Sequence, residues 1–284
     1  MNCRFLLLGS ETQVAREFRA MADAQSWSSI NIESFSDCLD ALQFEKEFVA
    51  RRPRAVINFL EFDQNCEYSA GNLDYFCRLA ERFELPFIQL ASWKLRDDVQ
   101  HSESISDDVA SYDLPLSGDQ CKFEAPIAQL HKHLLLRHSW LLDGDNNSLF
   151  DRFIPKLVRG DPFWVSDHDF GTPVSVQFLA RVIFALVQQI FAGANNWGVF
   201  HVHSADTCSE AEFCDHLVRQ LQKELDIEIR FPSVAGAGDD RRALSGNAYL
   251  QGRRITDNFG VQLPTWRRGF ARVLRDWLAN NQAL

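Results

Sequence analysis

Cys3-Arg4-Phe5-Leu6-Leu7-Leu8-Gly9 stands near the start of the chain as a short apolar run that ends at a glycine. The residues that follow, 12–24, are compatible with a helix. The glycine between them marks a tight turn, because glycine adopts backbone conformations that other residues avoid. The chain therefore begins with the pattern of a strand, a tight turn and a helix.

The same alternation continues through the first half of the chain. Further strands are predicted at 30–32, 55–60 and 87–90, and helices at 37–50 and 70–83. Strands separated by helices of this length form βαβ units, whose strands lie parallel in one sheet with helices on both faces. We therefore expect an α/β fold with a Rossmann-like, doubly wound parallel sheet.

The second half is less regular. Strands are predicted at 134–140, 199–202 and 227–231. Helices are predicted at 121–133, 174–191, 209–225 and 265–278, and a further helix follows a turn at 143–147 and ends at 159. Residues 97–117 are rich in Asp and Ser and predict a long exposed loop. We expect residues 1–142, with part of 174–206 and about 246–258, to form the Rossmann-like domain. The remainder of 143–284 is expected to form a smaller C-terminal α/β substrate domain.

The composition is that of a globular protein. Of the 284 residues, 46% are hydrophobic and 24% are charged, which excludes a mostly disordered chain. The net charge of −10 opposes binding to nucleic acid or to anionic lipid. The apolar run at 5–8 is too short to span a membrane and is followed by no cleavage site, so we expect a cytoplasmic protein.

Cysteine and histidine patterns predict no metal site. The seven cysteines include no C-x-x-C pair, so reduced structural thiols are expected. His131 and His133, like His201 and His203, are spaced by two, which would place both imidazoles on one face of a strand. Neither pair has a third ligand nearby in the sequence, and a structural role for His201 is the simpler interpretation.

Several segments match the motifs of one known family, in the same order along the chain. Residues 52–58 (RPRAVIN) resemble RPDVVIN, 136–140 (LRHSW) resemble LRTSW, and 167–173 (DHDFGTP) resemble the substrate loop DDQIGTP. Residues 198–201 (GVFH) resemble GIYH, and 259–266 (FGVQLPTW) resemble FGIRLPDW. The chain thus resembles the extended short-chain dehydrogenase/reductase family, and in particular dTDP-4-dehydrorhamnose reductases. This resemblance implies a Rossmann domain for NAD(P)H and a smaller domain that closes over a nucleotide-sugar.

The resemblance places a degenerate cofactor turn at the start of the chain. The family pattern G-x-x-G-x-x-G falls on Gly9, Thr12 and Ala15, with Gln13 after the second position. Glycines are needed there because backbone amides must approach the pyrophosphate closely, and the β-branched side chain of Thr12 would intrude.

A second part of the cofactor site follows the third predicted strand. The family carries small residues there, as in NAAA, whereas here Asn58 is followed by Phe59, Leu60 and Glu61. Bulk and negative charge would oppose a dinucleotide. We therefore expect no cofactor, and NADP(H) or NAD(H) only if the site is functional.

The catalytic set implied by the resemblance is incomplete. The family uses a Y-x-x-x-K pair, and four residues before Lys122 stands Gly118. Ser92 aligns with the family's Ser/Thr, and Tyr112 is the nearest tyrosine, which could serve only in a rearranged loop. Lys122 is either a remnant of the site or a solvated helix lysine. Without the tyrosine there is no proton donor for a carbonyl oxygen.

The implied substrate side is better preserved. Trp140, Gly171, Thr172 and Pro173 match segments that line the family's substrate pocket, and Asn247 matches the asparagine of its NSVL motif. A structural alternative exists for each, since Gly-Thr-Pro can form a rigid turn and Trp140 can be a core residue.

Other polar groups near the implied pocket have equally plain explanations. Asp169 stands where the family has Gln. The arginine pairs at 241–242 and 253–254 suit phosphate contacts, or are exposed loop charges. The Gly-x-Gly at 236–238 is interpreted as a flexible loop.

Three hypotheses follow. The first is a degenerate, catalytically inactive reductase homologue that binds a nucleotide-sugar or other small ligand, or a protein partner, in a regulatory role. The second is an active NAD(P)H-dependent nucleotide-sugar reductase or epimerase with an atypical site. The third is an interaction protein without a small ligand. Neither nucleic acid nor membrane is an expected partner, and an oligomer remains open.

Overall fold

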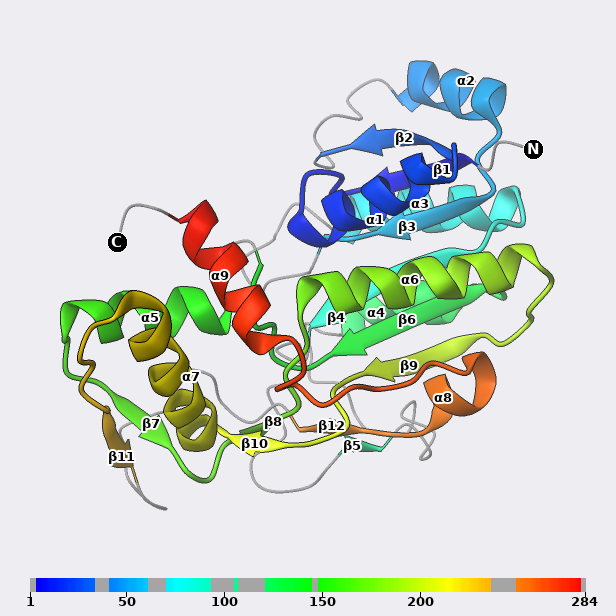
Figure 1. Cartoon of the computed structure of the whole chain (residues 1–284). Coiled ribbons are helices and arrows are strands. Elements are labelled where there is room, and N and C mark those ends of the chain that lie inside the picture. Colours follow the sequence, from blue (N-terminus) through cyan, green and yellow to red (C-terminus); the bar gives the residue numbers. More distant parts are fainter. Residues whose placement is uncertain are drawn as a thin grey trace.

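A six-stranded parallel sheet forms the centre of the molecule (Figure 1). The computed structural model describes residues 4–33, 41–60, 70–92, 105–106, 121–144, 148–235 and 249–281. The strand order is β2-β1-β3-β4-β6-β9, with every neighbouring pair parallel. Their bounds are β1 Arg4–Leu8, β2 Ser28–Ile32, β3 Ala55–Asn58, β4 Phe87–Ser92, β6 His133–His138 and β9 Gly198–Val202. The predicted Rossmann-like, doubly wound α/β fold is confirmed.

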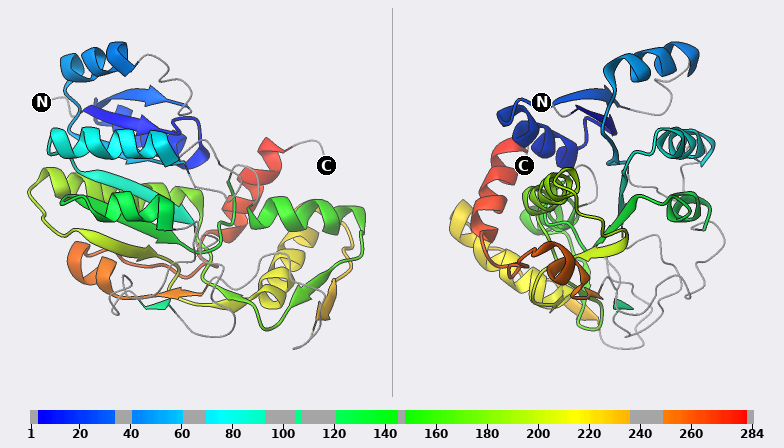
Figure 2. Two further views of the ribbon diagram at one scale, coloured as in Figure 1. Left: turned by 180° about the vertical axis from the view of Figure 1, so that it is seen from behind. Right: turned by 90° about the vertical axis from the view of Figure 1, so that its right-hand side faces the viewer.

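Helices cover both faces of this sheet (Figure 2). α1 (Gln13–Ala24) and α6 (Val176–Phe191) pack on one face, and α2 (Ala41–Arg51), α3 (Ala70–Arg82) and α4 (Cys121–Ala128) pack on the other. Successive side chains of a strand point to opposite faces, so Leu7 joins the core under α1 and α6 while Leu6 joins the core under α2 and α3. Continuous apolar strands are required because both faces are buried.

A smaller group of elements has a core of its own, centred on Phe153, Phe213 and Trp277. Its helices are α5 (Leu149–Arg159), α7 (Glu210–Leu225) and α9 (Phe270–Asn280). Two short sheets accompany them: β7 (Trp164–Ser166) pairs with β11 (Ser233–Ala235), and β8 (Phe170–Gly171) pairs with β10 (Cys208–Ser209). The domain boundaries predicted from the sequence stay a prediction.

Several elements differ from the predicted pattern. No strand forms at 227–231, where Ile227 and Phe231 are exposed; β11 begins later, at the residues that pair with β7. α9 begins at Phe270 and not at 265, because Gly269, at φ +81°, interrupts the helical backbone. Helix 121–133 ends at Ala128, and His133 already belongs to β6.

The sequence pattern also missed several short elements. β7, β8, β10, β12 (Leu250–Gln251) and the short helix α8 (Arg254–Phe259) were not predicted. They are too short to show a periodicity. Within the predicted loop 97–117, the structure describes only β5 (Ile105–Ser106), which pairs with β12.

Cys77, Cys208 and Cys214 are buried and form no disulfide. Burial raises the pKa of their thiols.

Among the described residues, no helix is both long enough and apolar enough to cross a membrane.

Candidate functional site

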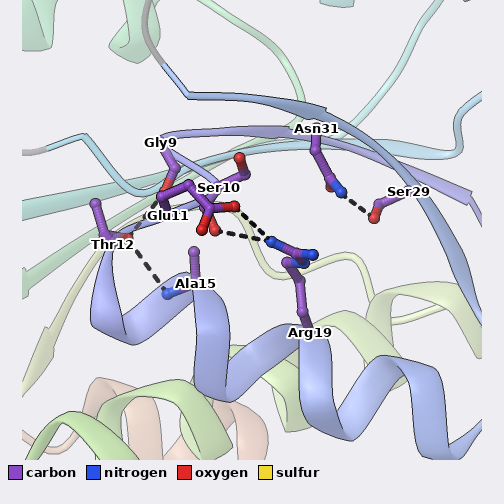
Figure 3. Close-up of polar contacts among 8 residues, drawn as sticks. All are labelled: Gly9, Ser10, Glu11, Thr12, Ala15, Arg19, Ser29 and Asn31. Carbon is purple, nitrogen blue, oxygen red and sulfur yellow. Dashed lines mark hydrogen bonds and ion pairs between the residues drawn. The ribbon is translucent and has the colours of Figure 1, made fainter.

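The turn between β1 and α1 is held by hydrogen bonds among its own residues (Figure 3). Gly9 has a φ of +69°, a backbone conformation that favours glycine. Thr12 is the N-cap of α1: its hydroxyl accepts a hydrogen bond from the Ala15 amide (3.3 Å) and donates one to the Gly9 carbonyl (2.9 Å). The Thr12 amide also donates to the Gly9 carbonyl (3.1 Å). The threonine hydroxyl therefore occupies one of the amides at the N-terminus of α1.

Leu60 covers this turn from the end of β3. A Cβ atom built on Gly9 would lie 2.8 Å from both Cγ and Cδ2 of Leu60, so the leucine side chain rests directly on the glycine. Phe59, the residue before it, is 1% exposed and belongs to the core under α1. An aliphatic side chain is thus packed directly against the first glycine of the turn.

Two buried amides hold Leu60 in this place. The Leu60 amide donates to Asn58 Oδ1 (3.1 Å), and Gln89 Nε2 donates to the Leu60 carbonyl (3.1 Å). Asn58 Nδ2 in turn donates to Gln89 Oε1 (2.8 Å). Asn58 and Gln89 are paired in the register of β3 and β4, and both are almost fully buried. We call this arrangement the amide clamp of Asn58 and Gln89.

The charges beside the turn also compensate one another. Glu11 Oε1 lies 2.8 Å from Arg19 Nη1, which also donates to the Ser10 carbonyl (3.3 Å). Within β2, Ser29 Oγ donates to Asn31 Oδ1 (2.7 Å). Both contacts are drawn in Figure 3. The turn therefore carries the Glu11 carboxylate, and the nearby guanidinium of Arg19 is bound to it and to the Ser10 carbonyl.

The predicted cofactor residues come together, whereas the predicted catalytic residues are described only in part. Gly9, Thr12 and Gln13 form the turn and the first residue of α1, and Asn58 lies opposite Leu8. Ser92 is the last residue of β4, 7% exposed, and lies opposite His138 of β6. Lys122 is in the first turn of α4. Its side chain, like Glu61, Tyr112 and Gly118, lies outside what the structure describes.

The predicted substrate residues form a packed joint between β6 and the smaller group of elements. A Cβ on Gly171 would collide with the indole ring of Trp140, so the backbone of Gly171 packs directly against the tryptophan. The Val174 amide donates to the Trp140 carbonyl (2.9 Å). The Thr172 amide donates to Ser139 Oγ (2.9 Å) and its hydroxyl to the Leu250 carbonyl (3.4 Å).

These contacts bury the residues that were predicted to line a substrate pocket and engage their polar groups within the protein. Trp140 and Thr172 are each 2% exposed, and Gly171 and Pro173 are buried. Asn247 lies outside the described residues, as do 236–238 and 241–242.

Other polar residues singled out in the sequence have structural contacts. Arg254 donates to the carbonyls of Val199 (2.9 Å) and Trp197 (3.1 Å) and so ties α8 to β9. His133 Nδ1 lies 2.6 Å from the Leu130 carbonyl, and burial lowers the pKa of its imidazole. His203 lies against the Ser204 and Gly252 carbonyls. Within the described part of the chain, no three His, Cys, Asp or Glu side chains are grouped as metal ligands would be.

Sequence reasoning missed one buried charged pair. Glu124 of α4 accepts hydrogen bonds from Arg137 Nε (3.2 Å) and Nη2 (2.5 Å), and both side chains are almost fully buried. The signal was Arg137, which directly follows the apolar run 134–136 in a predicted strand, since a buried guanidinium needs a carboxylate partner. The pair joins α4 to the sheet below it.

Known proteins share both sequence and fold with this chain. The family model described as "RmlD substrate binding domain" matches residues 121–278. The dTDP-4-dehydrorhamnose reductase of Escherichia coli (strain K12) is 22% identical over 150 residues, which are 51% of this chain and 50% of that protein. The chain thus spans about half the length of the curated relatives it matches.

Solved structures extend the similarity of fold over nearly the whole chain. A dTDP-4-dehydrorhamnose reductase from Bacillus anthracis, in complex with NADP, has a TM-score of 0.73 at 14% identity and covers 97% of this chain and 99% of its own. The enzyme WbmG of Bordetella bronchiseptica, in complex with NAD and UDP, has a TM-score of 0.74 at 13% identity, with 99% and 96% covered. The chain belongs to the RmlD substrate binding domain family, within the extended short-chain dehydrogenases/reductases.

Proposed function

We propose that this chain is a catalytically inactive member of its family, which works by binding a small ligand or a protein partner and does not use NAD(P)H. The observation that carries the proposal is Leu60, held over Gly9 by the amide clamp of Asn58 and Gln89. A dinucleotide lies across the carboxyl ends of the strands, with its pyrophosphate against the turn after the first strand. In this chain that approach meets a leucine side chain.

The residues of the turn do not fit a nicotinamide cofactor for two further reasons. The Thr12 hydroxyl occupies the Ala15 amide, and a phosphate would have to displace this cap to reach the helix N-terminus. The Arg19 guanidinium beside the turn is paired with Glu11, and it would have to leave this carboxylate to bind a pyrophosphate. Steric, hydrogen-bonding and charge effects therefore act in the same direction.

The second candidate is an active NAD(P)H-dependent reductase or epimerase. Ser92 favours it, because a hydroxyl remains at the carboxyl end of β4, opposite β6. Solved relatives of similar fold were crystallised with NADP, or with NAD and UDP. An active enzyme would still need a proton donor, which Tyr112 or a water molecule would have to supply. If this candidate is right, Tyr112→Phe abolishes substrate-dependent NADPH oxidation.

Calorimetric titration with NADPH, NADH and dTDP- and UDP-sugars tests the proposal. We expect no nicotinamide binding by the wild-type protein, and a gain of NADPH binding in the double variant Thr12→Gly/Leu60→Ala, which removes both obstructions. Leu225→Ala is a matched control, since it truncates a partly buried leucine at the end of α7, in the separate core of the smaller group. Sugar-nucleotide binding by the wild-type protein would support the ligand version of the proposal, and its absence the partner version.

Two results would contradict the proposal. Micromolar NADPH binding by the wild-type protein, accompanied by substrate-dependent oxidation at 340 nm (roughly where reduced nicotinamide absorbs), would establish the reductase. A double variant that folds normally and still fails to bind NADPH would show that Leu60 and Thr12 are not what excludes the cofactor. Thermal unfolding with and without ligand gives an independent readout, because a ligand of the native state raises Tm.

A further inference from the structure

A groove of about 670 Å³ runs between the N-terminal half of α6 and residues 261–273, which lead into α9. Its apolar walls come from two different cores. Phe178 and Val182 on α6, with Leu263 opposite, adjoin the core under α1 and α6, whereas Val273 adjoins the core of the smaller group. α6 and the start of α9 can be followed in Figure 1. An occupant of the groove would therefore touch both parts of the molecule.

The charges in this groove are all of one sign. Arg181 of α6, Arg268 and Arg272 line it, and the lining includes neither Asp nor Glu, in a protein with a net charge of −10. Arg272 donates a hydrogen bond to Gln177 across the groove and lies 3.8 Å from Asp276. Arg181 and Arg268 make no side-chain hydrogen bond or ion pair with any residue that the structure describes. Each wall thus contributes one exposed arginine that no described residue engages.

We propose that the groove binds a small amphiphilic anion: an apolar body that carries one carboxylate or phosphate group. The volume lies within the range of roughly 300–1,000 Å³ that is typical of small-ligand sites. Guanidinium groups bind carboxylates and phosphates through paired, charge-assisted hydrogen bonds. The apolar walls favour an aliphatic or aromatic body over a sugar, whose hydroxyl groups would lose their hydrogen bonds to water there.

The groove is separate from the glycine turn. None of residues 9–15 lines it, and of the predicted substrate residues that the structure describes only Pro173 does. Binding in the groove is therefore independent of whether the turn accepts NADPH. The variant Thr12→Gly/Leu60→Ala should leave it unchanged, so failure of the one proposal can be told from failure of the other.

Octyl phosphate and octyl glucoside provide matched probes, because they share one alkyl chain and differ in the charge of the head group. Calorimetric titration below the micellar concentration should show one octyl phosphate site per chain, and at least about tenfold weaker binding of octyl glucoside. Arg181→Gln/Arg268→Gln should weaken octyl phosphate binding by at least about tenfold, through the loss of two charge-assisted contacts. Arg230→Gln/Arg275→Gln changes the net charge equally outside the lining and should bind as the wild-type protein does.

Other results would overturn the proposal. Equal affinity for octyl glucoside would show that binding does not require a charged head group. Equal affinity for inorganic phosphate would show that binding does not require an apolar body. An equal loss in the two arginine variants would make the effect one of net charge. If octyl phosphate does not bind to the wild-type protein, the proposal that the groove binds an amphiphilic anion is wrong. If sedimentation velocity shows a dimer that only Arg181→Gln/Arg268→Gln dissociates, the groove is an interface between two copies.

Discussion

Gly9 and Gly171 are two motif glycines that are each covered by a large side chain, and the covers differ in origin. Trp140 lies on Gly171 and comes from the motif that resembles the family's LRTSW strand. Leu60 lies on Gly9 and stands where the family has a small residue. The first contact belongs to a joint between two parts of the molecule, and the second closes a turn. A glycine that survives in a motif therefore indicates that another group lies close to the backbone there, but it does not identify that group.

The backbone at the two glycines also differs. Gly9 has a positive φ of +69°, whereas no such φ occurs at Gly171. At Gly171 only the tryptophan excludes a side chain, while at Gly9 both the backbone conformation and Leu60 do so. Substitution can separate these two causes.

The largest effect is expected for Gly171→Ala. The new methyl group would overlap the indole ring of the buried Trp140, and neither the ring nor the joint around it can move easily. Overpacking of this kind should lower the free energy of unfolding by about 3 kcal/mol, measured by urea denaturation. Gly160→Ala is the control: Gly160 has a φ of +71° but has nothing within 4 Å of the new Cβ, so it should lose only about 1 kcal/mol. Equal losses would mean that Trp140 does not press on Gly171 in solution.

Gly9→Ala should have an intermediate effect of about 2 kcal/mol, because backbone strain adds to a contact with a flexible leucine. In a Leu60→Ala background the same substitution should lose less, because only the backbone strain and the contact with the amide nitrogen of residue 60 (3.0 Å) remain. A double-mutant cycle in urea measures the difference. A cycle without coupling would argue against Leu60 resting on Gly9.

How much the sequence predicts is clearest at these two sites. The strands that precede Gly9 and Leu60, β1 and β3, were predicted from apolar runs, and the misfit of Thr12 and Leu60 from the family pattern. The amide clamp was not predicted, because Asn58 and Gln89 are 31 residues apart and meet only through the register of β3 and β4. Likewise, Trp140 and Gly171 each stood in a recognised motif, but their contact depends on how residues 171–174 lie beside residues 140–142. Short strands such as β8 and β10 have two residues each and leave no periodic signal.

Thr12→Ala tests the closed turn with a smaller change. Loss of the hydrogen bond to the Ala15 amide removes the N-cap of α1 and should lower the free energy of unfolding by about 1 kcal/mol. Thr12→Ser keeps the hydroxyl and should remain close to the wild-type protein. If Thr12→Ala and Thr12→Ser unfold at the same urea concentration, the cap does not contribute to stability.

The smallest effect concerns the joint, and it depends on pH. Asp143 accepts a hydrogen bond from the Val176 amide (2.9 Å), and burial raises the pKa of its carboxyl to about 6. The unfolded value is lower, about 3.9, so folding favours the protonated form. This stabilisation is fully present below about pH 4 and is lost as the pH rises through about 6.

Asp143→Asn keeps an acceptor for the Val176 amide without the buried charge. At pH 7.5 the variant should be more stable than the wild-type protein by on the order of 1 kcal/mol, and the difference should vanish near pH 4. Urea denaturation at both pH values measures it. An unchanged difference would mean that Asp143 does not titrate between them.

The amide clamp has a consequence for how this molecule can change over generations. The hydrogen bonds to Asn58 and Gln89 engage the backbone of Leu60 and not its side chain, so any residue except proline at position 60 can make them. The obstruction over Gly9 is therefore carried by a few side-chain carbons on an intact scaffold. A lineage could gain or shed it by single substitutions without rebuilding the sheet edge, which makes this kind of closure easy to reverse.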